Sequence, residues 1–114
     1  MTFSLTARCP DSGTFGIAIS SSSPAVAARC THLRPGVGAA ASQNITDPRL
    51  GERLLDRLTA GDSAAEARAA VVGADPTADY RQLTVVDTAG RVAGHCGRHT
   101  LGTHHLALGD GAAA

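Results

Sequence analysis

The sequence predicts a single α+β domain, residues 1–114, in which antiparallel hairpins form the sheet and a helix pair covers one side. Three observations predict this fold class. Residues 2–20 alternate between apolar and polar side chains on both sides of a turn, residues 47–74 read as two helices in succession, and residues 80–97 read as a second hairpin. Taken in order, the elements are β-β-β-β, α-α, β-β.

The first hairpin begins at the second residue of the chain. Phe3, Leu5 and Ala7 lie on one side of the predicted strand, and the residues between them lie on the other. The segment CPDSG at residues 9–13 supplies a turn, and a second strand follows over residues 14–20. Residues 37–43 are so small that they predict a buried strand packed closely beneath another layer.

Two helices follow. Residues 47–60 repeat leucine at four-residue spacing, with Asp47 as a cap and Gly61 as the stop. Residues 63–74 begin with a capping box formed by Ser63 and Glu66. In the hairpin at residues 80–97 the predicted core residues are Leu83, Val85 and Val92, and beyond residue 97 the sequence shows no clear period.

Composition excludes several function classes. Ten Arg balance ten acidic residues, so no excess charge is available for nucleic acid or a membrane surface. No apolar run has transmembrane length, and residues 1–20 do not show the pattern expected of a signal peptide. The three cysteines are an odd number without a CxxC motif, which favours free thiols and a cytoplasmic location. Only 3% of residues are aromatic, so the core is thin and we expect the fold to need a partner chain, an oligomer or a second half.

Several polar segments are candidates for chemistry. Removal of Met1 would leave a free α-amine on Thr2, although a strand that simply begins early explains the same residues. One hydroxyl of the run Ser20–Ser23 could orient a nucleophile, while most of the run fits a solvated strand end. Gln43 and Asn44, at the end of the small-residue strand, are suited to bind a substrate carbonyl. The histidines between residues 95 and 105 fit no metal-ligand spacing, so we expect no metal and assign His104 to substrate contact.

Five segments carry a family resemblance: TFSLTARCPDSGTFGIAIS, PAVAA, RPGVGAAASQNITDPRLG, DYRQLTVVDTAGRVA and GRHTLGTHH. With these segments the chain resembles DUF1028, a bacterial family of unknown function placed among the N-terminal nucleophile (Ntn) hydrolases. The resemblance covers about the first half of that family's length. It implies half of a four-layer αββα sandwich of the proteasome β-subunit type, with the other half supplied by self-cleavage into two chains or by a split gene.

The resemblance also implies residue roles. Thr2 stands at the nucleophile position, and Ser42, Gln43 and Asn44 line the substrate groove. The run Ser20, Ser21, Ser22 occupies the place of a supporting acid, with Ser21 as the catalytic member and its two neighbours as substrate contacts. The supporting Lys is absent, and Arg34 is the nearest replacement in chain order. Arg34 cannot act as a base but could lower the pKa of the amine by charge repulsion.

The implied mechanism is amide hydrolysis. A neutral α-amine, with a pKa of roughly 7.7 to 8.0, takes the proton of its own threonine hydroxyl, and an acyl-enzyme forms and is hydrolysed. Backbone N–H groups or the amide of Gln43 or Asn44 would stabilise the oxyanion. We therefore expect an amidohydrolase of small or cyclic amides that needs no cofactor, is completed by a second chain and forms a homo-oligomer. The alternatives are a non-catalytic scaffold or small-molecule binding subunit with the nucleophile on a partner chain, and a fragment without activity of its own.

Overall fold

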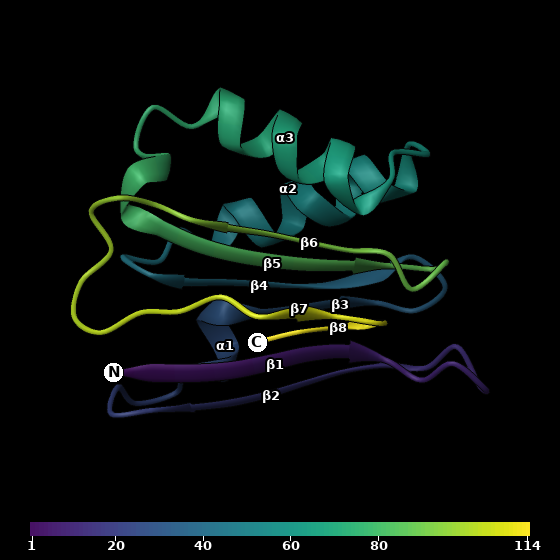
Figure 1. The fold of residues 1–114 in the computed structure, drawn as a ribbon, viewed down its shortest axis with the longest axis horizontal. Coiled ribbons are helices and arrows are strands. Elements are labelled where there is room, and N and C mark those ends of the chain that lie inside the picture. The colour runs from purple at the N-terminus through teal and green to yellow at the C-terminus, as the bar shows by residue number, and fades with distance from the viewer.

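The computed structural model describes residues 1–114 and arranges them in three layers, with two helices above one sheet and a second sheet below it (Figure 1). The strands are β1 (Thr2–Arg8), β2 (Phe15–Ser21), β3 (Thr31–Arg34), β4 (Gly38–Asn44), β5 (Arg81–Asp87), β6 (Val92–Cys96), β7 (Leu108–Gly109) and β8 (Ala112–Ala113). The helices are α1 (Ala27–Cys30), α2 (Pro48–Thr59) and α3 (Ala64–Ala74), with a 3₁₀ turn at Ala78–Tyr80. The strand orders β3-β4-β5-β6 and β2-β1-β8-β7 are antiparallel throughout, which confirms the predicted α+β class.

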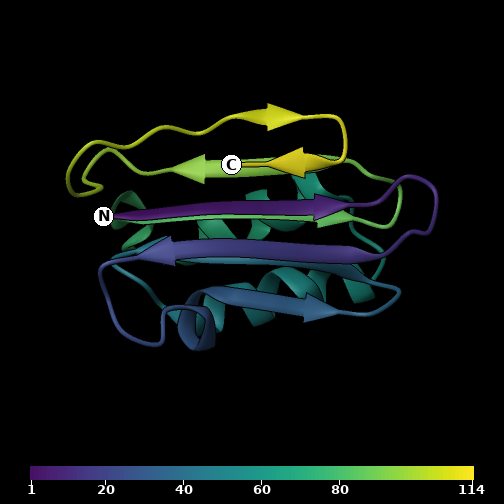
Figure 2. The same cartoon turned by 90° about the horizontal axis from the view of Figure 1, so that it is seen from below.

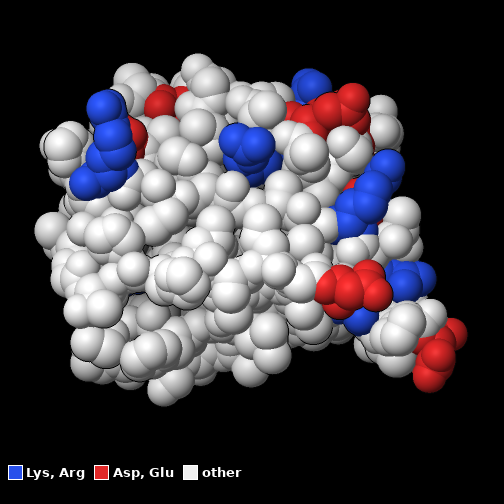
Figure 3. Space-filling model, in the orientation of Figure 1, with Lys and Arg blue, Asp and Glu red and all other residues white.

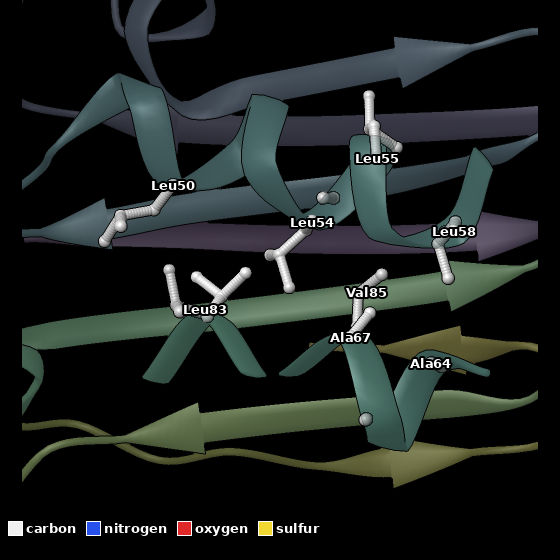
Figure 4. Packing of buried hydrophobic residues seen from close by; sticks show 11 residues of the cluster. Leu50, Leu54, Leu55, Leu58, Ala64, Ala67, Leu83 and Val85 are labelled. Carbon is white, nitrogen blue, oxygen red and sulfur yellow. The ribbon is translucent and has the colours of Figure 1, made fainter. Parts of the chain in front are cut away.

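Helix α2 is held to the upper sheet by its leucine stripe. Leu50, Leu54 and Leu55 are at most 1% exposed and belong to one buried cluster with Ala40 of β4 and Leu83 and Val85 of β5, toward which Leu54 points in Figure 4. Four-residue spacing places these leucines on one face, and their burial is the main force that fixes the helix. The helix begins where predicted, because the Asp47 carboxylate accepts a hydrogen bond of 3.0 Å from the Arg49 backbone N–H.

Helix α3 packs on the sheet through small residues. Its first turn is fixed in two ways, by a capping box and by a hydrogen bond to Asp87. The predicted capping box is present: the Ser63 backbone N–H donates to the Glu66 carboxylate at 2.8 Å, and the Glu66 N–H donates to the Ser63 hydroxyl at 3.3 Å. The carboxylate of Asp87, at the end of β5, accepts from the Ala64 N–H at 3.1 Å. This bond ties the start of the helix to the sheet beneath it.

The upper sheet confirms the predicted small-residue strand. Ala39, Ala40 and Ala41 of β4 are at most 1% exposed, because helices lie above this strand and the second sheet lies below it. The prediction for β6 needs a correction. Ala93 is the buried core residue and Val92 is only partly buried, because Ala93 pairs with Val85 on the helix side.

The lower sheet has an unexpected polarity. Thr6 on β1 points between the sheets, is fully buried and shares a 3.1 Å hydrogen bond with Thr84 of β5. The alternate residues Phe3 and Leu5 point away from the molecule and are 67% and 46% exposed. The alternation of the first strand is therefore confirmed, with its polar side inward.

The sequence did not indicate two features. A four-residue helix, α1, precedes β3, and the segment without period after Gly97 ends in the two-residue strands β7 and β8. Strand β8 pairs with β1 only at Thr6 and Ala7, so the edge of β1 over residues 2–5 has no neighbour on that side. Such short elements lack the length that periodicity requires. None of the helices is both long and apolar enough to cross a membrane.

Candidate functional site

The N-terminal end of β1 brings two hydroxyls together. Thr2 lies opposite Ser21 of β2, and the distance between their hydroxyl oxygens is 2.9 Å. The next pair along, Met1 and Ser22, is joined by a backbone hydrogen bond. Hydrogen-bonded and non-hydrogen-bonded pairs alternate along an antiparallel ladder. Because Met1 and Ser22 form a hydrogen-bonded pair, Thr2 and Ser21 form a non-hydrogen-bonded pair, the type in which the Cα atoms are closer, at about 4.5 Å. Both side chains are half-buried and face the space between the sheets.

The serines after β2 have different partners. The Ser21 hydroxyl oxygen accepts a hydrogen bond of 3.1 Å from the Ser23 backbone N–H, which leaves its proton free to be donated to Thr2. Ser22 is exposed, and its hydroxyl accepts from the Met1 ammonium at 3.3 Å. Ser20 lies on the outer face of the sheet, opposite Phe3, and is exposed. The predicted cluster is therefore divided, and of the three only Ser21 contacts Thr2.

The backbone nitrogen of Thr2 points away from β2. The Arg8 N–H donates to the Gly111 carbonyl, on the β8 side of β1. Backbone groups of a strand alternate with period two, so the nitrogens of Thr6, Ser4 and Thr2 point to that same side. At Thr2 this side is the edge of β1 that no strand covers. An α-amine formed there by removal of Met1 would be accessible.

Gln43 takes part in a buried amide relay. Its Nε2 donates to Oε1 of Gln82 at 3.0 Å, and Nε2 of Gln82 donates to the His105 carbonyl at 2.7 Å. Because a carbonyl can only accept, the direction of the whole relay is fixed. The amide nitrogen of Gln43 is thus engaged, and its Oε1 is a buried acceptor without a partner. The sequence analysis did not select Gln82. The signal that could have identified it is its position two residues before Thr84 on β5, which places both polar side chains on the same face of the sheet.

The other predicted groove residues serve the fold. Ser42 is fully buried on the helix side of the sheet, and its hydroxyl donates to the Asp47 carbonyl at 3.0 Å. The side chain of Asn44 accepts from the Leu101 N–H at 2.8 Å and donates to the Leu101 carbonyl at 3.3 Å. Both polar groups of Asn44 therefore hold the loop after β6. Neither residue presents a free group toward Thr2.

Arg34 lies at the opposite end of the molecule. It pairs with Gly38, the first residue of β4, and its guanidinium contacts Glu52 at 3.2 Å and Asp56 at 3.0 Å on helix α2. The prediction that it repels the amine of Thr2 is corrected: β3 is antiparallel to β4, and this places Arg34 at the far end, on the helix side. The pKa of Glu52 is held below its usual value by the hydrogen bond from His32, with Arg34 adding to the effect.

The histidines of β6 and of the loop that follows it do not converge. His104 is exposed in the loop, and its Nδ1 lies 3.0 Å from the Gly102 carbonyl. His95 contacts the Ala78 carbonyl at 2.9 Å instead. No three potential metal ligands gather anywhere in the structure. His104 therefore remains a prediction as a substrate contact.

The two strands that hold Thr2 and Ser21 carry almost no charged side chains. On the face that Figure 3 shows, charged side chains gather over the helices and at the right-hand end, and the lower left surface, where Figure 1 places the N-terminus, has none. Strands β1 and β2 contain one charged residue between them, Arg8. Activation of Thr2 would therefore depend on its own α-amine and on Ser21.

Comparisons with known proteins identify a family and a solved structure to which this chain is similar. The sequence model described as "Family of unknown function (DUF1028)" matches residues 2–114. The crystal structure of a protein from Silicibacter pomeroyi, described with the same family, superposes with a TM-score of 0.93 at 26% identity. That match covers 98% of this chain and 52% of the other, so this chain spans about half the length of its structural relative. No curated protein matches the chain.

Proposed function

This chain belongs to the DUF1028 family of unknown function. Within that family, we propose that it is an amidohydrolase of the N-terminal nucleophile type, with Thr2 as the nucleophile. The observation that carries the proposal is the 2.9 Å contact between the hydroxyls of Thr2 and Ser21. The inward position of this hydroxyl pair at the start of β1, beside a backbone edge that no strand covers, supports the proposal.

The chemistry follows from the groups present. Once Met1 is removed, the neutral amine of Thr2 accepts the proton of its own hydroxyl, and the oxygen attacks the amide carbon of the substrate. The Ser21 hydroxyl keeps its proton and donates a hydrogen bond to the same oxygen, which holds that oxygen in place and stabilises the negative charge that develops on it during deprotonation. The leaving amine takes up the proton from the ammonium, and water then hydrolyses the ester. Because the amide nitrogen of Gln43 is engaged with Gln82, backbone N–H groups would bind the oxyanion.

The proposed substrate is a small or cyclic amide, and the reaction requires no cofactor. Strands β1 and β2 carry only one charged residue, Arg8, at the end far from Thr2, and this supports a neutral group on the substrate beside the scissile bond. We further propose that a second chain, from self-cleavage or a split gene, completes the site in a cytoplasmic homo-oligomer. The half-length match to the Silicibacter pomeroyi protein supports this second chain.

One observation favours a second function. The Met1 ammonium donates a hydrogen bond of 3.3 Å to the Ser22 hydroxyl, so a retained N-terminal methionine has a partner in the structure. If Met1 is retained, Thr2 is an ordinary strand residue and the chain is a non-catalytic scaffold or small-molecule binding subunit. The nucleophile would then be the first residue of the partner chain.

Substitutions at the end of β1 distinguish the two functions. The assay measures hydrolysis of a panel of small linear and cyclic amides by the natively purified protein. We expect Thr2→Ala to abolish turnover and Thr2→Ser to retain it, because serine keeps the hydroxyl. Ser21→Ala should lower kcat by about tenfold or more, the equivalent of one hydrogen bond.

Ser20→Ala is the matched control, because Ser20 is the next residue on the same strand and faces outward. It should leave kcat unchanged. Turnover that survives Thr2→Ala would show that a residue other than Thr2 is the nucleophile. Equal losses for Ser20→Ala and Ser21→Ala would show that the hydroxyl contact has no catalytic role.

A further inference from the structure

We infer that the amide oxygen of Gln43 selects substrates that carry a neutral N–H group, namely primary amides, lactams and cyclic imides, over tertiary amides and esters. The inference deepens the proposed function and rests on it, because it names the class of amide that reaches Thr2. Its basis is the buried pair of Gln43 and Gln82 between the two sheets.

The polarity of this pair is fixed from one end. The His105 carbonyl can only accept, so it takes a hydrogen bond of 2.7 Å from Nε2 of Gln82 and turns Oε1 of Gln82 toward Gln43. Nε2 of Gln43 donates to that oxygen at 3.0 Å, which leaves Oε1 of Gln43 as the last acceptor of the relay. This oxygen is buried without a hydrogen-bond partner, in a residue that is only 7% exposed. A donor on a bound molecule would remove the free-energy cost of the unpaired acceptor.

The Gln43–Gln82 pair lies between the Thr6–Thr84 contact and Thr2. Gln82 precedes Thr84 by two residues on β5, and Thr84 contacts Thr6 of β1. Strands β1 and β5 run in the same direction and overlap when seen from below (Figure 1 and Figure 2), so Gln82 and its β4 neighbour Gln43 lie toward Thr2. At about 3.4 Å per residue, the pair is midway between Thr6 and Thr2, about 7 Å from each along the strands.

The surroundings of Gln43 favour a neutral donor. Gln43 points to the lower sheet, because its neighbour Ser42 faces the helices and successive residues of a strand alternate. Strand β4 packs against β1 and β2, whose inward residues at this end include Thr2, Ser4 and Ser21.

Strands β2 and β4 contain no charged residue, and β1 contains only Arg8, at its other end. An ammonium group would find no counter-charge on these strands, and a carboxylate would face another acceptor. The donor that fits the Gln43 oxygen is therefore a neutral N–H. The scissile amide of the proposed reaction supplies one whenever its nitrogen carries a hydrogen.

The test compares two pairs of probes that differ by one N–H group: γ-butyrolactam with its N-methyl derivative, and succinimide with N-methylsuccinimide. Binding to the natively purified, isotope-labelled protein is measured by NMR titration. We expect the N–H member of each pair to bind about tenfold more tightly, because it alone donates to the buried acceptor. Gln43→Leu should remove this preference.

Gln82→Leu should lower the preference as well, because it removes the oxygen that holds Nε2 of Gln43 and leaves the Gln43 amide free to turn. Gln82 is thus a positioning residue. Thr84→Val is the matched control: it breaks another buried hydrogen bond between the sheets, the one to Thr6, and should leave the preference unchanged. The wild-type comparison and Gln82→Leu decide the question even if Gln43→Leu does not fold.

Equal binding of the N–H and N-methyl probes by the wild type would overturn the inference, and would show that an internal water satisfies the Gln43 oxygen. Absence of binding by both pairs would also overturn it, as would a preference that Gln43→Leu leaves unchanged. Binding of these probes does not require hydrolysis. If turnover survives Thr2→Ala while the N–H preference is present, the Thr2 mechanism fails and the role of Gln43 stands.

Discussion

Replacement of Gly51 by alanine should destabilise the protein, although alanine is the better helix former. Gly51 lies in α2, where the ring of His32 from β3 packs against it. A Cβ atom at Gly51 would lie 2.0 Å from His32 Cδ2 and 2.4 Å from Cγ. The ring has little freedom to move, since it is 92% buried (8% exposed) and its Nδ1 is bonded to Glu52 at 3.0 Å.

Two opposing contributions set the magnitude. Alanine in place of a helical glycine is normally worth about 0.5 to 1 kcal/mol. Overpacking of a buried site costs about 1 to 3 kcal/mol, and a contact of 2.0 Å with a pinned ring belongs at the upper end. We therefore expect a net loss of about 1 to 2 kcal/mol. At about 4 to 8 °C per kcal/mol for a domain of this size, Tm should fall by about 4 to 16 °C.

The assay is urea unfolding followed by circular dichroism, with Gly73→Ala as the control. Gly73 lies within α3 and has open space where its Cβ would be, so its alanine variant should gain stability. In a His32→Ala background the effect of Gly51→Ala should become neutral or favourable, because the obstructing ring is absent. A stabilising Gly51→Ala in the wild-type background would refute the reasoning, and so would an effect that is unchanged by His32→Ala.

Two further predictions concern polar groups of the fold. The hydrogen bond from Arg49 lowers the pKa of Asp47 to about 2, so its contribution to stability is complete above about pH 4 and is lost as pH falls toward 2. Asp47→Asn should flatten this part of the acid unfolding profile, and a profile identical to wild type would contradict the assignment. Gln82→Leu should cost about 1 to 3 kcal/mol in urea unfolding, because it leaves the Gln43 amide and the His105 carbonyl without their partner. A loss below about half a kcal/mol would show that water replaces the relay.

The elements that the sequence predicted well have long, redundant signals. The leucines of α2 repeat over three turns, and the capping box of α3 marks its own first residue, so both helices match within a residue or two. The alternation over residues 2–8 likewise predicted β1. These signals lie within each segment, and hydrogen bonding and burial within the same segment determine whether it forms a helix or a strand.

The direction of each side chain depended on partners that are distant in sequence. Alternation along β1 shows that the strand has two different faces but not which of them is buried. The face that carries Thr6 is buried because it packs against the upper sheet, where Thr6 contacts Thr84. Ser42 and Gln43 are neighbours in sequence but lie on opposite faces of β4, so one serves the helix layer and the other the space between sheets. Arg34 was chosen only because its place in the chain order is nearest to that of the supporting Lys implied by the resemblance, whereas antiparallel pairing of β3 with β4 carries Arg34 to the end of the molecule opposite Thr2. The part of the site that could be predicted is therefore the pair of Thr2 with the serine run.

The intact mass of natively purified protein tests the central claim most directly, together with the site of labelling by a β-lactone, a small electrophile that acylates an activated threonine hydroxyl. The account predicts a chain lighter by one methionine, labelled at Thr2 in the wild type and unlabelled in Thr2→Ala. A chain of full calculated mass, unlabelled and accompanied by a second polypeptide that carries the label at its own first residue, would contradict it.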